Sequence, residues 1–413
     1  MDLVVQKYGG TSVSDIDKIK SVARHIVNTK KRGRNVLAVV SAMAGETNRL
    51  IELSKTVMNP PDERELDVIT SSGEQISSGL LAMCIKSLGH KAVSFQGHQV
   101  RIITDKSHSN ARILKIDNSK MDSALKEGSI AIVAGFQGVD DDGNVTTLGR
   151  GGSDLTAVAL AAVLNADSCE LYKDDVDGIY TTDPVICNDA KKLNKISYDE
   201  MLEMASLGSK ILQARSVEFA KKYGVRLHVL PTSSSDATGT WVVEEEEAMK
   251  DMEKMLISGV TFDKNQAKIT ITEVPDSPGI ASDIFTPLSD KGMFIDMIVQ
   301  NVGKKGHTDM TFTVPRTEFK KALKITERVA GKLNAKSVIS DNNISKVSII
   351  GIGMKTHSGI ASKMFSTLAN EGINIMMIST SEIKISCVIE EKYTELAVRS
   401  LHTAFELGEI NAK

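Results

Sequence analysis

The chain of 413 residues has few of the residues that mark several large classes of protein. Aromatic residues make up only 4% of it, which argues against a surface that stacks nucleic-acid bases. There are 50 Lys and Arg residues against 53 Asp and Glu, so no excess of positive charge exists to attract nucleic acid. No apolar run approaches the roughly 18 residues of a membrane span. We therefore expect neither a nucleic-acid nor a membrane partner.

Cysteine is also sparse. The four cysteines lie far apart, and no two pairs have the spacing of a zinc site or of a thioredoxin-like redox motif. So few scattered cysteines in so long a chain are typical of a reduced protein. We therefore predict a cytoplasmic protein with no resident metal ion.

Strand-like and helix-like stretches alternate over the first ~240 residues. The uninterrupted apolar runs Val36–Val40 and Ile130–Phe136 predict strands buried on both faces. Ser14 is the expected cap of a first helix, and a long helix is expected over Met201–Tyr223. This alternation predicts an α/β domain with a mostly parallel sheet between layers of helices.

The last third of the chain contains a repeat. Ten residues of the segment that begins at Ser277 recur at a fixed offset of 80 in the segment that begins at His357. Each copy predicts a strand, a helix and two further strands, and two copies predict a pair of docked modules rather than an extended array. The expected divisions are 1–245 for a catalytic domain, 246–262 for a linker, and 263–342 and 343–413 for the two modules.

Glycine-rich turns follow several of the expected strands. The patterns of P-loop enzymes, dinucleotide-binding folds and protein kinases are all missing from the sequence. Paired glycines allow backbone N–H groups to approach an anion, and Lys7 and Arg150 stand beside two such pairs. One such turn alone is more often just a tight turn. Because ligands bind at the carboxyl ends of parallel strands, the turns together predict a site for ATP phosphates and an acidic acceptor.

The motifs that carry this chemistry occur in one order. They are KYGGTSV at Lys7, SAMAGETNRL at Ser41, SSGEQ at Ser71, GFQG at Gly135, LGRGGSD at Leu148, DDVDGIYTTDP at Asp174 and SLGSKILQARSVEFA at Ser206. This series resembles that of the aspartate kinases, which have the amino-acid-kinase fold, a carbamate-kinase-like three-layer sandwich. The repeat resembles the paired, ferredoxin-like ACT domains of the same family, so the resemblance covers essentially the whole chain.

The resemblance implies a feedback-regulated enzyme. ATP would phosphorylate the side-chain carboxylate of L-aspartate to 4-phospho-L-aspartate with Mg²⁺, the first step toward lysine, threonine and methionine. Lysine, threonine or both would inhibit the enzyme at the ACT domains.

The resemblance also assigns site residues, matched position by position. Lys7 would contact the transferred phosphate, Asp154 would orient Lys7, and Arg150 would hold the α-carboxylate of aspartate. The implied ATP-binding residues are Lys7, Tyr8, Gly9, Gly10, Asp174, Asp175, Tyr180, Ser209 and Lys210. The implied aspartate-binding residues are Ser41, Thr47, Glu74 (on the ammonium group), Arg150, Gly151, Gly152 and Ser153.

Effector contacts follow from the repeat in the same way. They are Asp276, Phe294, Ile295, Asp296, Gln300, Asn301, Ile360, Ala361, Asn374, Ile375, Ser381 and Glu382. For the apolar members, packing in the core is an equally good interpretation. The resemblance implies a homo-oligomer, a dimer or a tetramer. The methionines at 249, 252 and 255 also allow an internally started small subunit, although three ordinary linker methionines explain them better.

The sequence departs from the family pattern at two places in the loop that the resemblance assigns to nucleotide binding. The run from Tyr172 to Gly178 is one residue longer than usual, and Val185 stands where the family usually has Arg. They leave open a non-catalytic amino-acid sensor as an alternative. A second alternative is a kinase of another small acid, such as N-acetylglutamate, which the ACT-like repeat disfavours.

Overall fold

The computed structural model describes residues 2–174, 176–206, 211–233, 237–249, 256–301 and 306–408. The chain divides into two compact units, each made of two segments. The first is Met1–Ile179 with Lys192–Glu253, and the second is Tyr180–Lys191 with Lys254–Lys413. Within the described ranges, no helix combines the length and the apolar character needed to cross a membrane.

Among the described residues, an eight-stranded sheet forms the centre of the first unit. Its order is β12 (Lys195–Ser197), β14 (Thr240–Val243), β13 (Leu227–Pro231), β9 (Ser168–Lys173), β1 (Leu3–Tyr8), β2 (Asn35–Val40), β6 (Ile130–Ala134) and β3 (Ala92–Phe95). Neighbouring strands are parallel except for β13 and β14. The mostly parallel sheet predicted from the sequence is confirmed.

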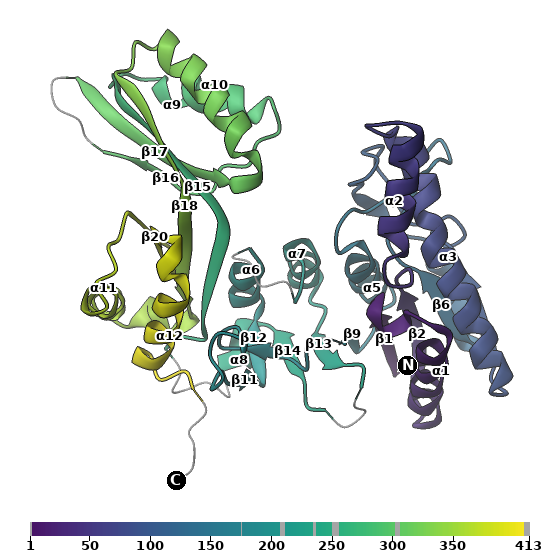
Figure 1. Cartoon of the computed structure of the whole chain (residues 1–413). Coiled ribbons are helices and arrows are strands. Elements are labelled where there is room, and N and C mark those ends of the chain that lie inside the picture. The colour runs from purple at the N-terminus through teal and green to yellow at the C-terminus, as the bar shows by residue number, and fades with distance from the viewer. Residues whose placement is uncertain are drawn as a thin grey trace. The chain divides into compact units, whose positions relative to one another are not determined.

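Helices cover this sheet because its apolar strands must be buried on both faces. The helices of the first unit are α1 (Ile16–Lys31), α2 (Glu46–Val57), α3 (Glu63–Ser87), α4 (Ser119–Lys126), α5 (Gly152–Val163), α6 (Tyr198–Ser206), α7 (Ala214–Tyr223) and α8 (Glu245–Met249). Helices α1 and α3 share one core with alternate residues of β1, β2 and β6. Helix α5 packs against β1, β2 and β9, and α7 packs against α5 (Figure 1).

Two predictions about these helices were wrong. The cap of α1 is Asp15 rather than Ser14, because the Asp15 carboxylate accepts hydrogen bonds from the amides of Asp17 and Lys18. The single helix expected over Met201–Tyr223 is two helices, α6 and α7. Gln213 has an extended backbone and forms the N-cap of α7, so the helical pattern is interrupted there.

Smaller strands complete the first unit. A four-stranded sheet has the order β5 (Ile113–Lys115), β4 (Ile103–Thr104), β7 (Gln137–Val139) and β8 (Val145–Thr147). The short strands β10 (Ile179–Tyr180) and β11 (Lys192–Leu193) pair with each other. Strand β8 leads directly into the LGRGGSD motif at Leu148.

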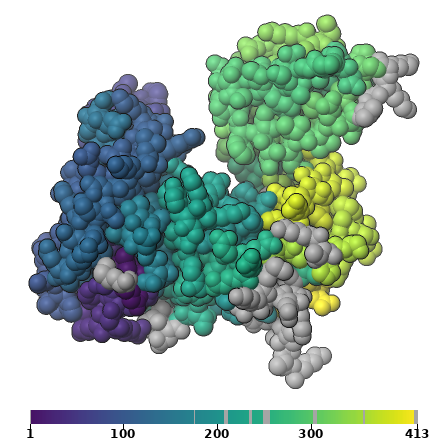
Figure 2. All heavy atoms as spheres, turned by 180° about the vertical axis from the view of Figure 1, so that it is seen from behind, coloured from purple at the N-terminus to yellow at the C-terminus, as the bar shows by residue number. Residues whose placement is uncertain are grey.

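The second unit contains the two copies of the repeat. Its described strands form one sheet with the order β16 (Ile298–Gln300), β17 (His307–Pro315), β15 (Gly259–Pro275), β18 (Ser337–Ile350), β20 (Lys384–Glu390) and β19 (Met377–Thr380). All of its strand pairs are antiparallel. Helices α9 (Ile280–Ser289) and α10 (Phe319–Lys332) belong to one module, and α11 (Ile360–Asn370) and α12 (Thr394–Ala404) to the other. The modules form neighbouring lobes, green and yellow in Figure 2.

The long strands β15 and β18 each contribute to both modules. The start of β15, Gly259–Asp263, pairs with the end of β18, and Val260 lies in the core of the second module together with Ile257. The end of β15 pairs with the start of β18 in the first module. The expected linker 246–262 therefore differs from the structure at its end, where the residues from Ile257 onward pack in the second module. The first module is inserted within the second.

Two glycines of α3 allow a matched test of this packing. A Cβ on Gly73 would lie 2.7 Å from the Cβ of Ala42, whereas a Cβ on Gly79 would meet no atom within 4 Å. We expect Gly79→Ala to stabilise the fold by about 0.5–1 kcal/mol because alanine is the better helix former. Gly73→Ala should destabilise the fold by about 1–3 kcal/mol through overpacking. Urea unfolding measures both, and equal effects of the two substitutions would contradict the packing described here.

Candidate active site

The glycine-rich motifs meet at the carboxyl edge of the large sheet. Ala44 donates its amide to the Gly10 carbonyl at 3.1 Å, which joins the turn after β1 to the turn after β2. Gln137 donates its side-chain amide to the Ser71 carbonyl at 3.0 Å, which joins the turn after β6 to α3. Gly135 lies against Ser153 so closely that a Cβ would be 2.8 Å from that side chain. Five motifs that are far apart in sequence thus surround one place.

Asp154 lies between two lysines at this edge. Its Oδ1 is 2.6 Å from the Nζ of Lys7 and its Oδ2 is 2.9 Å from the Nζ of Lys173. Lys7 is in β1, Lys173 ends the neighbouring strand β9, and Asp154 lies in the first turn of α5. All three side chains are at most 15% exposed. This group, called the Asp154 cluster below, carries a net positive charge.

Burial and charge act on these groups in opposite directions. Burial lowers the pKa of Lys7, and the charge of Lys173 adds to this effect while Asp154 opposes it. Burial raises the pKa of Asp154, but the charges of Lys173 and Lys7 outweigh burial and hold that pKa well below its usual value. Asp154 is therefore ionised at neutral pH and keeps both lysine side chains in place.

The turn after β1 adds unpaired amides to this positive charge. A Cβ on Gly10 would lie 2.8 Å from the Ala42 carbonyl oxygen, so only glycine allows the two turns to approach. Within the described part of the chain, the amides of Gly9 and Gly10 donate no hydrogen bond. A short 3₁₀ helix, Thr11–Val13, follows them. Such amides beside lysines form an anion-binding arrangement.

A second polar group lies where β9 ends. Asp174 accepts a hydrogen bond from the Ser12 hydroxyl at 2.8 Å and pairs with Lys18 at 3.0 Å. Ser12 also contacts the Thr232 hydroxyl at 2.8 Å, just after β13. Burial alone would raise the pKa of Asp174, but hydrogen bonds from Thr232, Lys18 and Ser12 lower it. The ends of β1, β9 and β13 are thus linked through side chains.

Glu74 presents an unpaired carboxylate oxygen. Its Oε1 accepts the Ala42 amide at 3.0 Å, while its Oε2 is buried and has no hydrogen-bond partner among the described residues. Burial raises the pKa of Glu74 to about 7, although the Ala42 amide and the charge of Lys7 oppose the shift. A buried acceptor without a partner costs free energy unless a ligand supplies a donor.

The N-terminus of α5 carries the LGRGGSD motif. Gly151 has φ 71° and caps the helix, and Gly152 and Ser153 form its first turn beside Asp154. Arg150 is exposed and forms no ion pair with any described residue. A helix N-terminus beside a free guanidinium suits a carboxylate ligand.

Comparison with known proteins agrees with this geometry. Residues 2–231 match the model of the amino acid kinase family, and residues 272–328 and 347–405 match that of the ACT domain. The chain is 55% identical to an aspartate kinase of Pseudomonas putida over 98% of both chains. It is 48% identical to an aspartokinase of Helicobacter pylori, over 98% of this chain and all of that one.

The chain belongs to the aspartate kinase family. Its fold is similar to the crystal structure of the Clostridium acetobutylicum aspartate kinase, with a TM-score of 0.80, 25% identity, and coverage of 97% of this chain and 100% of that one. The predicted family, the enzyme class and the fold with its ACT domains are confirmed.

The structure describes some of the other residues that the family pattern assigns to the site. The Tyr8 side chain is fully buried and stacks on Tyr172, so only its backbone faces the turn. Tyr180 belongs to the second unit and packs against the core of its second module. Asp175, Ser209 and Lys210 lie outside the described residues. Ser41 directly follows β2, and Thr47 is in the first turn of α2.

The structure adds two residues that the sequence did not single out. Lys173 is in the run from Tyr172 to Gly178, which is one residue longer than the family pattern. Its position at the carboxyl end of a buried strand could have indicated a role in the site. Phe136, in the GFQG motif, has φ 70°, which is strained for a bulky residue. Hydrogen bonds to Thr156 and Leu148 hold it in place. Its strain could not be foreseen, because only the closure of the turn between β6 and β7 requires it.

The effector residues assigned by the family pattern form two sets, one in each module. Ile295, Ile360, Ala361 and Ile375 pack in or against the two cores, and Asp296 pairs with the buried Lys346. The remaining members are exposed: Asp276, Phe294, Gln300, Asn301, Asn374, Ser381 and Glu382. Strands β16 and β19, which adjoin the two sets, lie at opposite edges of the sheet.

Glu74 should lower the stability of the unliganded fold in a pH-dependent way. Its pKa of about 7 exceeds that of an unfolded Glu, so the fold loses stability as the pH rises from 4.5 to about 7, by about 3 kcal/mol in all. Glu74→Gln removes this cost and should raise Tm at pH 8 far more than at pH 5. The control Glu63→Gln, at an exposed position of α3, should show little difference. An equal change in Tm at both pH values would contradict the buried, unpaired carboxylate.

Proposed function

We propose that the chain transfers the γ-phosphoryl group of ATP to the side-chain carboxylate of L-aspartate, forming 4-phospho-L-aspartate and ADP. The observation that carries this proposal is the Asp154 cluster, which lies beside the two unpaired amides of Gly9 and Gly10. Membership of the aspartate kinase family supports the same reaction.

This reaction needs charge stabilisation rather than a strong base. A carboxylate is already a nucleophile at neutral pH, so the barrier comes from the repulsion between anions and from the need for in-line placement. Lys7 and Lys173 would contact the phosphate oxygens, and the amides of Gly9 and Gly10 would donate to them. Fixed donors of this kind stabilise the charge that develops during transfer. Asp154 acts as a positioning residue, because both of its oxygens are occupied by lysines.

Aspartate would bind across α3 and α5. Its ammonium group fits Glu74, whose Oε2 lacks a donor, and its α-carboxylate fits the free guanidinium of Arg150. Ser41, Thr47, Gly151, Gly152 and Ser153 would complete the wall of this subsite. An aspartate held at both of its α-substituents presents its side-chain carboxylate toward the phosphate.

Magnesium fits this site as a companion of the nucleotide. Mg²⁺ is usually bound through substrate phosphates and water together with one or two carboxylates. Asp154 is already paired with two lysines, so we assign no protein ligand to the ion. Bound Mg²⁺ would neutralise part of the charge of the phosphates.

Of the other residues predicted to bind the nucleotide, Asp174 has supporting contacts to Ser12 and Lys18. The roles of Asp175, Tyr180, Ser209 and Lys210 stay predictions.

We propose feedback inhibition by lysine, threonine or both, and a homo-oligomer. The exposed Phe294, Ile298 and Ile378 lie in or beside the edge strands β16 and β19. An unpaired strand edge with apolar neighbours favours pairing with a second copy. That pairing would bring the exposed polar effector residues of two chains together. A cytoplasmic location and the internally started subunit stay predictions, and Met252 and Met255 lie outside the described residues.

A trapping assay tests the proposed reaction. Purified protein with MgATP, L-aspartate and hydroxylamine should form aspartyl hydroxamate, since an acyl phosphate is captured by hydroxylamine. Omission of aspartate or its replacement by N-acetylglutamate should abolish the signal, and lysine or threonine should suppress it. Absence of signal in a protein that still binds lysine or threonine would contradict the proposal and favour the sensor.

The same assay tests the aspartate subsite. Arg150→Ala should raise the KM for aspartate about 10- to 100-fold, as expected for the loss of a charged hydrogen bond. The control Arg24→Ala, at an exposed position of α1, should leave the KM unchanged.

A further inference from the structure

The segment Tyr180–Lys191 connects two parts of the first unit but belongs to the second unit. Its backbone joins the second ACT module: the Val260 amide donates to the Thr181 carbonyl at 2.7 Å, and Ala190 bridges to Gly408. The ends of this segment continue into β10 and β11. The contacts of this segment therefore determine how firmly it is attached to the second unit.

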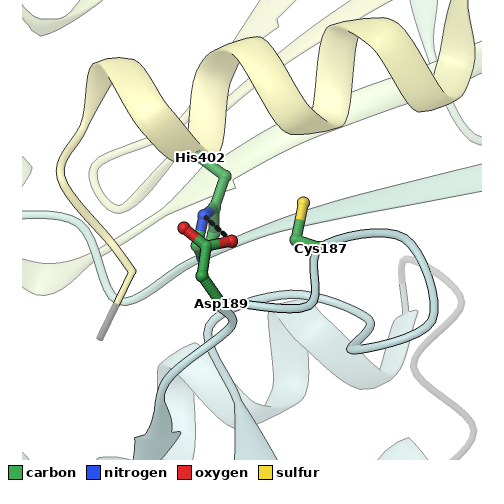
Figure 3. A group of neighbouring side chains, drawn as sticks. All are labelled: Cys187, Asp189 and His402. Carbon is green, nitrogen blue, oxygen red and sulfur yellow. Dashed lines mark ion pairs between the residues drawn. The ribbon is translucent and has the colours of Figure 1, made fainter. Parts of the chain in front are cut away.

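Three side chains of residue types that bind metal ions come together at this segment. Cys187 and Asp189 lie on the segment, and His402 reaches toward them from α12 (Figure 3). Their ligand atoms all lie within 4.8 Å of one another, and the Nδ1 of His402 is 3.8 Å from the Oδ1 of Asp189. Cys187 and His402 are buried, while Asp189 is exposed. The cysteine spacing could not predict this group, because the histidine lies far away in the sequence.

The Thr181 hydroxyl holds the ring of His402 in place. This hydroxyl lies 2.9 Å from the Nε2 of His402, accepts the Lys191 amide at 3.0 Å and lies 3.2 Å from the Leu407 carbonyl oxygen. The Nδ1 of His402 is the ring nitrogen that faces the carboxylate of Asp189.

We propose that Cys187, Asp189 and His402 bind a divalent transition-metal ion of the zinc class. A thiolate, an imidazole and a carboxylate form a typical donor set for zinc, and the exposed side of Asp189 leaves a fourth position for water. A hydrogen bond between the second ring nitrogen and an oxygen, here the Thr181 hydroxyl, is the usual support of a metal-binding histidine. A tetrahedral ion requires the ligand atoms to draw together to about 3.3–3.6 Å, a movement the exposed Asp189 permits.

Cys187 and Asp189 come from the segment, and His402 comes from α12. The bound ion would link the segment to α12 and stabilise the second unit. This effect does not depend on the proposed kinase reaction.

Cobalt provides the direct test in the full-length protein. After chelator treatment, titration with Co²⁺ should produce a thiolate-to-cobalt charge-transfer band in the near ultraviolet that saturates at one ion per chain. Zn²⁺ should displace this band. Cys187→Ser should abolish it and the matched Cys84→Ser should keep it, which separates this site from any cobalt bound with nucleotide.

Asp189→Asn gives a second variant that should fold, because Asp189 is exposed. It should weaken cobalt binding and remove most of the rise in Tm that Zn²⁺ causes, whereas Asp183→Asn, on the same segment, should not. No charge-transfer band in the unchanged protein, or an undiminished band in Cys187→Ser, would overturn the proposal.

Discussion

The arrangement of the first unit depends on Asp154 and the two lysines that it pairs. Lys7 and Lys173 come from neighbouring parallel strands, and without a shared anion two buried cations at this distance would repel each other. Asp154 can reach both because α5 starts at the same edge of the sheet, where the glycines of LGRGGSD allow a sharp entry into the helix. The ion pairs thus fix strands, helix and positive charge together in the place where a phosphate would bind.

Around this cluster the site leaves several groups unsatisfied. The amides of Gly9 and Gly10, the Oε2 of Glu74 and the guanidinium of Arg150 have no partners among the residues described. Their chemistry is complementary to phosphate, ammonium and carboxylate respectively. A fold that keeps such groups unpaired gives up stability that a ligand restores, which is the usual compromise at a functional site.

Much of this could be predicted from the sequence. The apolar runs of β2 and β6 and the fixed offset of the repeat have local signatures, and the motif order indicated the family. The role of Lys173 could not be predicted, because Lys173 and its partner Asp154 come close to each other only when the sheet has folded. The division between α6 and α7 could not be predicted, because the helical spacing of apolar residues in the sequence continues across both helices. The shared strands β15 and β18 could not be foreseen either, because a repeat shows that two units exist but not that one is inserted in the other.

Asp154→Asn tests the central claim most directly. The substitution keeps the size of the side chain but removes the charge that positions both lysines. We predict that kcat in the hydroxamate assay falls about 10²-fold, as expected when reacting groups are misplaced. The KM for aspartate should change little, Asp154→Glu should restore part of the activity, and circular dichroism should confirm the fold. A folded Asp154→Asn protein with normal kcat would contradict the account.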